Sequence, residues 1–233
     1  MSEGMIIRRG GGGGGFDPTG AILKVVTSAG CTVNVSGTSY SRTQTDAEGF
    51  PRSGDANVVE HFFNIPSTAF GTITVTATNT YGTNTKTLTV NTAGKVYEQL
   101  CGGLNIILDS TFGLQSGLAL VASNYTYVDR DKEIVSTSYS INPNSLLFSD
   151  DINITPYSQL TVAFGTHAGS PVKSATVSLI DEGNTTLARL IFSDSEEKTG
   201  SITNKYYPTA KLHCSGEAYS SSYRLHITKI VLS

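Results

Sequence analysis

The sequence predicts an all-β protein, and three observations support this fold class. Only 15% of the residues are charged, well below the ~25% typical of soluble domains, while Thr, Ser, Gly, Asn and Tyr are abundant. Residues that favour helices are not enriched. Apolar and polar residues alternate with a period of two through most of the chain, which is typical of half-buried strands.

The chain length predicts more than one domain. Its 233 residues exceed the ~100–150 residues of a usual single domain. We divide it into an N-terminal arm (residues 1–19), a first β-sandwich (20–93), a linker (94–103) and a larger β-sandwich (104–233). The linker falls in NTAGKVYEQLCGGL, whose glycines separate two β-rich stretches.

The N-terminal arm reads MSEGMIIRRGGGGGG before a turn at FDPTG. We expect it to dock on a partner: its apolar residues insert, its arginines pair with acidic or phosphate-like groups, and its glycines allow close backbone approach. The anchoring residues are Met5, Ile6, Ile7, Arg8, Arg9, Gly10 and Gly11. The alternative is a flexible tether, because ordering a glycine tract costs much entropy.

Short strand-like segments follow one another between residues 20 and 92. They read AILKVVTS (21–28), CTVNVSG (31–37), VVEHFFNIP (58–66) and GTITVTATNTYGTNTKTLTVN (71–91). The last holds two strands joined at NTYGTN, and in the first of them Ile73, Val75 and Ala77 alternate with threonines. The polar stretch 38–57 is a long loop or a weakly paired hairpin.

This order of segments resembles the small immunoglobulin-like (Ig-like) and PEGA-like modules of bacterial surface proteins and phage tail proteins. IPSTAFGTITVTAT stands where those modules have a proline-containing turn and a glycine before an alternating strand. The resemblance covers residues 20–92 and implies a small Ig-like β-sandwich. It implies no particular function.

The second half contains roughly eight to nine further strand-like segments with turn signals between them, which suits a two-sheet jelly roll. The segments are 105–109, 119–129, 133–141, 145–155, 159–167, 173–181, 186–193, 210–216 and 224–233. The succession INITPYSQLTVAFGTH, ATVSLIDEGNTTLARLIFS and YRLHITKIVLS resembles jelly-roll modules of carbohydrate-binding and galactose-binding type. Such modules bind sugars in some proteins and act as spacers or trimer contacts in others.

The predicted fold is therefore a small Ig-like β-sandwich followed by a larger jelly-roll β-sandwich, with an extended Gly-rich N-terminal arm. The cysteines Cys31, Cys101 and Cys214 are far apart and lack C-x-x-C spacing, which argues against a disulfide scaffold and a zinc site. We expect free, buried thiols; one disulfide with one spare thiol is the alternative.

No catalytic motif, cofactor or metal is predicted. None of the histidines lies in an H-E-x-x-H arrangement. His213 and His226 each alternate with apolar neighbours, so each could lie on one face of its strand and the two could be near one another. Asp129, Asp131 and Glu133 alternate through a loop and are calcium-ligand candidates, but the neighbouring Arg130 and Lys132 compensate their charge. We expect solvated loops there and no enzyme activity.

Tyrosines near the C-terminus are candidate glycan contacts. The segment KYYPTAKLHCSGEAYSSSYR holds Tyr206, Tyr207, Tyr219 and Tyr223. Aromatic faces stack on the apolar C–H surface of sugar rings, and the phenol adds a hydrogen bond. The alternative is structural packing or subunit contact, and the absence of Trp weighs against a sugar platform.

Composition also predicts where the protein works. A net charge of −3 without a basic patch argues against nucleic acid, and no apolar run approaches the ~20 residues that cross a membrane. The polar, charge-poor β composition is typical of proteins outside cells, yet no secretory signal is recognised. Virion proteins of bacteriophages, assembled in the host cytoplasm and released by lysis, fit both facts.

The sequence therefore favours a structural virion protein of a bacteriophage, resembling head or tail decoration and fibre components. It would be anchored to other virion proteins by its arm and would form a homo-oligomer such as a trimer. Its outer domain would contact a host-surface glycan or stabilise an oligomer. The alternative is a carbohydrate-binding or adhesion module of a bacterial surface protein.

Overall fold

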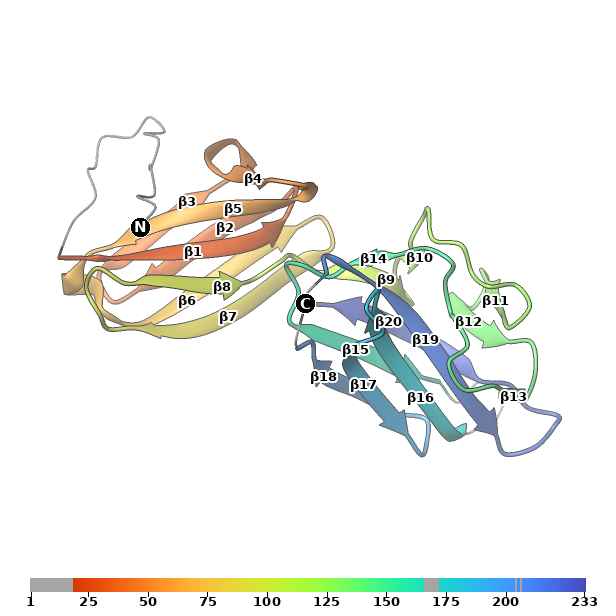
Figure 1. Cartoon of the computed structure of the whole chain (residues 1–233). Helices are drawn as coiled ribbons and strands as arrows, with labels where there is room; N and C mark the ends of the chain where they lie inside the picture. Colours follow the sequence, from red (N-terminus) through yellow and green to blue (C-terminus); the bar gives the residue numbers. More distant parts are fainter. Residues whose placement is uncertain (1–18, 166–171, 204, 206) are drawn as a thin grey trace.

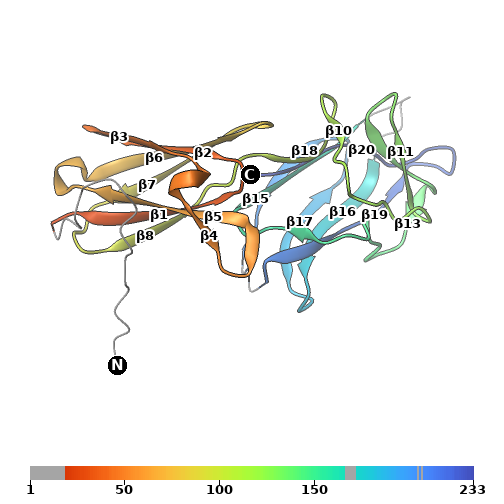
Figure 2. The same cartoon turned by 90° about the horizontal axis from the view of Figure 1, so that it is seen from above.

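A computed structural model describes residues 19–165, 172–203, 205 and 207–233, and this part of the chain is all-β as predicted. The only helical elements in these ranges are two single 3-10 turns, η1 (Asp46–Glu48) and η2 (Ser67–Ala69). Figure 1 shows two β-sandwiches joined end to end, and Figure 2 shows the same elongated arrangement from above. We call them the N-terminal and the C-terminal sandwich.

The N-terminal sandwich consists of two four-stranded sheets. One sheet has the order β4 (Phe50–Arg52), β5 (Asp55–Ile65), β1 (Ala21–Ser28), β8 (Val96–Leu100). The other has the order β3 (Tyr40–Gln44), β2 (Thr32–Gly37), β6 (Gly71–Asn79), β7 (Gly82–Val90). All pairings are antiparallel except that of β1 with β8.

The alternation in β6 and β7 explains the threonine content of this half. Ile73, Val75 and Ala77 point into the core and are fully buried, so the threonines between them face outward. Thr76 lies opposite Thr85 on β7, and the hydroxyls of the pair Thr78 and Thr83 are 3.0 Å apart. The predicted pair of strands joined at NTYGTN is confirmed.

Two stretches differ from the sequence prediction. The expected linker, residues 94–103, contributes strand β8, which pairs in parallel with β1 about seventy positions earlier. In the polar stretch 38–57, β3 pairs with β2 and β4 pairs with β5, so the hairpin alternative is supported and the long loop is wrong. Local polarity and glycines predict loops, but the tertiary pairing partners outweigh that preference.

The C-terminal sandwich also has two sheets. The seven-stranded sheet contains β9 (Asn105–Asp109), β10 (Gly113–Leu114), β11 (Tyr125–Val128), β12 (Glu133–Ser136), β15 (Gln159–Phe164), β18 (Glu197–Ser201) and β20 (His226–Leu232). The five-stranded sheet contains β13 (Ser140–Ile141), β14 (Ile152–Asn153), β16 (Val172–Asp181), β17 (Thr186–Phe192) and β19 (Thr209–Ala218). Strand β20 pairs with β9, β12 and β15, so the last strand holds its sheet together.

Long strands expected between residues 119 and 155 are short instead. Only four-residue and two-residue strands form there, namely β11 to β14. Turn-forming Asn, Asp, Ser and Pro residues interrupt the apolar runs. Asn144, for example, has a positive φ of 63°, which ends the extended conformation.

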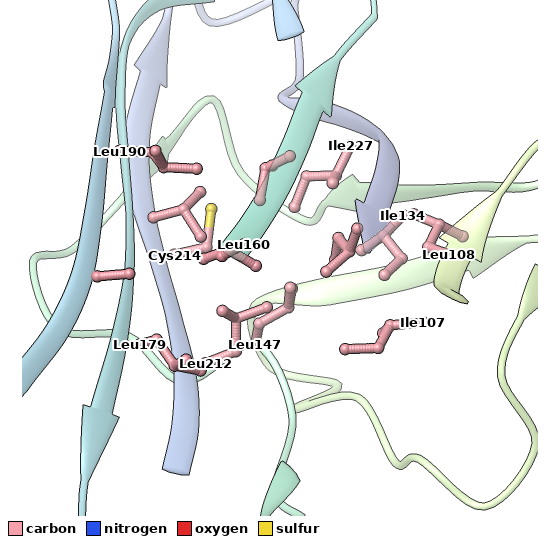
Figure 3. Packing of buried hydrophobic residues seen from close by; sticks show 14 of the residues in the cluster. Ile107, Leu108, Ile134, Leu147, Leu160, Leu179, Leu190, Leu212, Cys214 and Ile227 are labelled. Atoms are coloured by element: carbon pink, nitrogen blue, oxygen red, sulfur yellow. The ribbon is translucent and has the colours of Figure 1, made fainter. Parts of the chain in front are cut away.

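Apolar side chains from both sheets fill the core of the C-terminal sandwich. Figure 3 shows Leu212 and Cys214 of β19 lying between the sheets with Leu160 and Ile227 of the seven-stranded sheet. Tyr125 is also buried, and its hydroxyl donates a 2.6 Å hydrogen bond to the Cys214 carbonyl. Burial raises the pKa of this phenol, so it stays a neutral donor inside the core.

All three cysteines are free and buried, as the first expectation stated. Burial raises the pKa of Cys101 to about 11 and that of Cys214 to about 12. Thiolates are the reactive form of cysteine. The folded protein therefore presents no reactive thiol at these positions.

No helix in the described residues is long and apolar enough to span a membrane.

We predict that replacing Leu212 by Ala lowers the free energy of unfolding by about 2–5 kcal/mol, because the side chain is fully buried and leaves a cavity. Ile191→Ala is the control, since Ile191 on the same sheet is 60% exposed and should cost no more than about 0.5 kcal/mol. Urea denaturation measures both. Equal losses would contradict the packing described for this core.

We also predict that a thiol reagent at mildly alkaline pH labels none of the three cysteines in the folded protein and all of them after unfolding in guanidinium. The reason is their burial and, for Cys101 and Cys214, the raised pKa. Mass spectrometry counts the labels. A single label after unfolding without reductant would instead indicate one disulfide.

Candidate ligand-binding groove

The two sandwiches meet at the short segment Cys101–Leu104, which connects β8 to β9. The side chain of Asn84 donates to the Gly102 carbonyl and that of Asn79 donates to the Leu104 carbonyl, both at 2.9 Å. The Gly102 amide donates to the Pro156 carbonyl of the C-terminal sandwich, also at 2.9 Å. Both sandwiches therefore bind the backbone of the connection.

Gly103 lies where this segment passes close to the N-terminal sandwich. A Cβ at this position would stand 2.4 Å from Asn79 Nδ2 and 2.9 Å from Cys31 Sγ. Any side chain would push the connection outward. The Gly102–Gly103 pair, predicted to lie in the linker between the domains, is thus a tightly packed contact.

Side chains also bridge the two sandwiches directly. Asp55 Oδ2 accepts from Asn153 Nδ2 at 2.8 Å and from the Thr155 hydroxyl at 3.4 Å. Lys86 Nζ on β7 donates to Gln159 Oε1 on β15 at 3.2 Å. These bonds fix the relative position of the walls of the groove described next.

A half-buried lysine stabilises the turn that follows β14. Lys205 Nζ donates to the carbonyls of Ile154, Thr155 and Tyr157 at 3.2, 2.8 and 2.6 Å. Burial, followed by the nearby charge of Arg52, lowers the pKa of Lys205 to about 8. The three carbonyls hold this ammonium group in place, so the turn has a fixed shape.

A groove of about 250 Å³ opens at this junction; we call it the junction groove. Its wall comes from the β1–β2 turn, β5 and the β6–β7 turn of one sandwich and from β9, β14 and neighbouring loops of the other. Its polar lining consists of Ser28, Asn57, Asn79, Asn105, Gln115 and Asn153. None of its lining residues carries a charge.

The carboxamides of the junction groove fall into two groups. Those of Asn79 and Asn153 are held at both ends, because each also accepts a backbone amide, from Tyr81 and Thr155 respectively, at 3.0 Å. Those of Asn57, Asn105 and Gln115 make no hydrogen bond within the described part of the chain. The second group is available to a ligand.

Two aromatic rings lie at the groove. Tyr81, from the β6–β7 turn, lines it and is 39% exposed. Phe112, from the β9–β10 turn, is 51% exposed and packs edge-on against Tyr81 with ring centroids 5.5 Å apart. Each sandwich thus contributes one exposed ring to the same place.

Tyr157 also lines the groove and is 5% exposed. Burial raises the pKa of its phenol to about 12, while a hydrogen bond with Ser28 acts in the opposite direction. The phenol therefore remains protonated at neutral pH and is a hydrogen-bond donor.

A second hollow of about 340 Å³ lies on the outer face of the seven-stranded sheet. Its charged side chains include Glu197 and Lys229, which pair with each other at 3.0 Å. Thr161, also in the lining, has its hydroxyl 2.8 Å from that of Thr199. Because these groups already have partners, the junction groove is the stronger candidate.

The structure does not gather the predicted glycan tyrosines in one place. Tyr207 precedes β19 and lies beside Gly183 in the β16–β17 turn, whereas Tyr219 and Tyr223 follow β19. A ten-residue strand separates these ends by about 30 Å. Tyr207 and Tyr219 are exposed, and Tyr223 packs partly against the core. Tyr206 lies outside the described residues, and glycan contact at these tyrosines stays a prediction.

The predicted anchoring arm, Met5 to Gly11, also lies outside the described residues. Its docking role stays a prediction.

The acidic and histidine candidates do not converge on a metal. Glu133 is buried and contacts His226 Nδ1 at 3.0 Å, and Asp131 pairs with the neighbouring Arg130 at 2.9 Å. His213 on β19, in the other sheet from His226, contacts the carbonyl of Asn144 in the β13–β14 loop. Among the described residues, no group of three or more His, Cys, Asp or Glu side chains is arranged to hold a metal ion.

Sequence reasoning missed the junction groove because its polar residues are scattered. Asn57 and Asn153, for example, lie almost a hundred positions apart, and no spacing between them marks a site. The only sequence signal is the general abundance of Asn.

Comparison with protein-family models gives no match, and a search of curated proteins gives none. Among solved structures, the chain is similar to SGBP-B of the Bacteroides ovatus mixed-linkage glucan utilization locus in complex with a mixed-linkage heptasaccharide, with 12% sequence identity and a TM-score of 0.27. The match covers 93% of this chain and 50% of that one, so this chain spans about half the length of that structure. At this identity and TM-score, the similarity assigns neither a family nor a ligand.

We predict that Gly103→Ala destabilises the protein by about 1–3 kcal/mol, because the added methyl group overlaps Asn79 and Cys31. The control is Gly183→Ala, whose methyl group would approach the exposed ring of Tyr207 at 3.0 Å, a ring that has room to move. Thermal unfolding compares the two variants. Equal stability of Gly103→Ala and the unchanged protein would contradict the close approach at the junction.

Proposed function

We propose that this chain is a carbohydrate-binding or adhesion module whose junction groove binds an uncharged sugar. The observation that carries the proposal is the set of three carboxamides without partners, Asn57, Asn105 and Gln115, in a groove with an exposed aromatic pair. A carboxamide offers a donor and an acceptor on one rigid group. That combination suits neighbouring hydroxyls of a sugar ring, each of which both donates and accepts.

The aromatic pair supplies the apolar part of the site. A sugar ring has C–H faces that pack on aromatic rings, while its hydroxyls point to the sides. Tyr81 and Phe112 belong to different sandwiches and hold each other edge-on. Their relative orientation is therefore set before a ligand arrives.

The neutral lining favours an uncharged ligand. A phosphate, sulfate or uronic acid would lose hydration in the groove without gaining a cationic partner from the lining residues. Neutral hydroxyls exchange water for carboxamides at a much lower cost. Neutral glycans are therefore the ligand class that we propose.

We further propose that the module binds without catalysis. General acid–base catalysis requires titratable groups placed on either side of the reacting bond, and glycosidases generally use two carboxylates. The junction groove is lined by carboxamides, phenols and small side chains. These groups support recognition of a sugar rather than cleavage of its glycosidic bond.

Attachment to a bacteriophage particle stays a separate prediction. It rests on the composition and on the arm, whose anchoring residues lie outside the described part of the chain. Homo-oligomer formation is likewise a prediction. The groove serves a glycan-binding module equally well on a virion and on a bacterial surface.

A panel of immobilised neutral oligosaccharides, followed by calorimetry on those retained, tests the proposal. We expect Asn57→Ala and Gln115→Ala each to weaken binding about five- to tenfold, the size of one hydrogen bond, and Tyr81→Ala to weaken it at least as much. Asn64→Ala is the matched control, because Asn64 is an exposed asparagine on the same strand as Asn57.

Two results would contradict the proposal. One is the failure of the unchanged protein to bind any neutral oligosaccharide in the panel. The other is unchanged binding by the groove variants. If Tyr219→Ala abolished binding instead, the site would lie at the loop after β19.

A further inference from the structure

A group of buried polar atoms without partners lies beside the junction groove. His61 on β5 is fully buried, and neither of its ring nitrogens has a hydrogen-bond partner. Asp46 Oδ1 on η1 and Gln44 Oε1 on β3 are buried and unpartnered as well. Because buried polar groups are nearly always hydrogen-bonded, such a group of atoms points to a second arrangement of the same residues.

The geometry between His61 and Asp46 suits a change of protonation. His61 Nε2 lies 4.0 Å from Asp46 Oδ1, too far for a hydrogen bond. Burial lowers the pKa of His61 from its ordinary value of 6.5, and the charges of Asp46 and Glu48 oppose this effect. The imidazole is therefore neutral at neutral pH, and acid turns it into a cation facing a carboxylate.

Other charged groups near His61 already have partners or face away from it. Lys24 on β1 lies opposite Phe62, and therefore on the other face of β5, where it pairs with Glu60. Arg52 on β4 also pairs with Glu60, at 3.9 Å. On η1, Glu48 accepts the Thr45 amide at 2.8 Å.

Two further titratable or charged residues lie on β3 and in the turn before β2. Neither competes with Asp46 for a protonated His61. Arg42 on β3 is exposed, and its guanidinium donates to the Ser41 carbonyl. The Cys31 thiol before β2 has a pKa raised by burial and also by Asp46, so it stays neutral. Asp46 is the carboxylate within reach of a protonated His61.

Asp46 connects His61 to the wall of the junction groove. Its other oxygen, Oδ2, accepts the Gly30 amide at 2.6 Å. Gly30, with φ of 84°, forms the β1–β2 turn together with Ala29, which lines the groove. Ala29 in turn donates to the carbonyl of Asn57 at 2.8 Å, and Asn57 is one of the available carboxamides.

We propose that Asp46 is a pH-sensitive latch: when His61 is protonated, the Asp46 carboxylate moves to the imidazolium and releases the Gly30 amide, which loosens the β1–β2 turn. A charge-assisted hydrogen bond needs about 2.8 Å between the heavy atoms, so the carboxylate must approach His61 and leave Gly30. The consequence for the ligand, weaker binding at acid pH, rests on the function proposed above.

The Gly30 amide reports on the latch without any ligand. In a ¹⁵N NMR pH titration of the full chain, we expect the Gly30 resonance to shift as the pH falls below the ordinary histidine value of 6.5. Its protection from hydrogen exchange should fall about tenfold, the effect of one lost hydrogen bond. His61→Phe and His61→Gln should abolish both changes, while His213→Gln, altered on the other sandwich, should keep them.

Folding stability gives a second measurement with a defined sign. A histidine with a lowered pKa binds protons more readily in the unfolded chain, so acid favours unfolding. The free energy of unfolding should therefore decrease as the pH falls through 6.5 and below, and His61→Phe should reduce this decrease. This variant also shows whether the site tolerates an apolar ring.

Two outcomes would overturn the latch: a Gly30 resonance that does not respond to acid, or a response that persists in both His61 variants. A ligand whose affinity is the same above and below pH 6.5 while Gly30 responds would overturn the proposed link between the latch and the groove. A persistent response would assign the change to Asp46 itself. If no neutral oligosaccharide binds at all, the proposed function fails, and the Gly30 titration still decides the latch.

Discussion

The close contact of both sandwiches with the segment Cys101–Leu104 is the constraint on which the rest of the molecule depends. Two asparagines of the N-terminal sandwich bind carbonyls of this segment, and the C-terminal sandwich binds its Gly102 amide. A side chain at Gly103 would separate them. Without this contact, the walls of the junction groove would belong to two independent bodies.

The same residue type performs two tasks at the junction. Asn79 and Asn153 use both ends of their carboxamides within the protein, which stabilises the walls. Asn57, Asn105 and Gln115 leave theirs unpaired toward the groove. A rigid frame with unpaired polar groups is the arrangement that preorganises a binding site, because little entropy is lost when the ligand arrives.

The polar groups around His61 differ from those of the groove in their access to water. The carboxamides of the groove can hydrogen-bond to water, so their lack of protein partners costs little. His61 is fully enclosed, and an unpartnered buried polar group costs on the order of 1–3 kcal/mol. The unpartnered His61 nevertheless lies next to Asp46, and Asp46 accepts the Gly30 amide of the β1–β2 turn in the groove wall.

Much of the fold followed from local patterns. Ile73, Val75 and Ala77 alternate with threonines, and this alternation alone places β6 with one face in the core. Strand β8 was missed because its partner β1 lies about seventy positions earlier, and the flanking glycines favoured a linker. The length of the strands between residues 119 and 155 was overestimated, because apolar content does not show where Asn and Pro end an extended segment.

The sequence by itself determined the all-β class and the inward face of the regular strands, because these depend on periodicity within one segment. Only the tertiary structure decided the junction groove and the latch. Asn57 and Gln115 line the same groove but come from different sandwiches. His61 lies near Asp46 because η1 packs on β5. Contacts between residues so distant in the chain depend on how the sheets pack, and no local pattern encodes them.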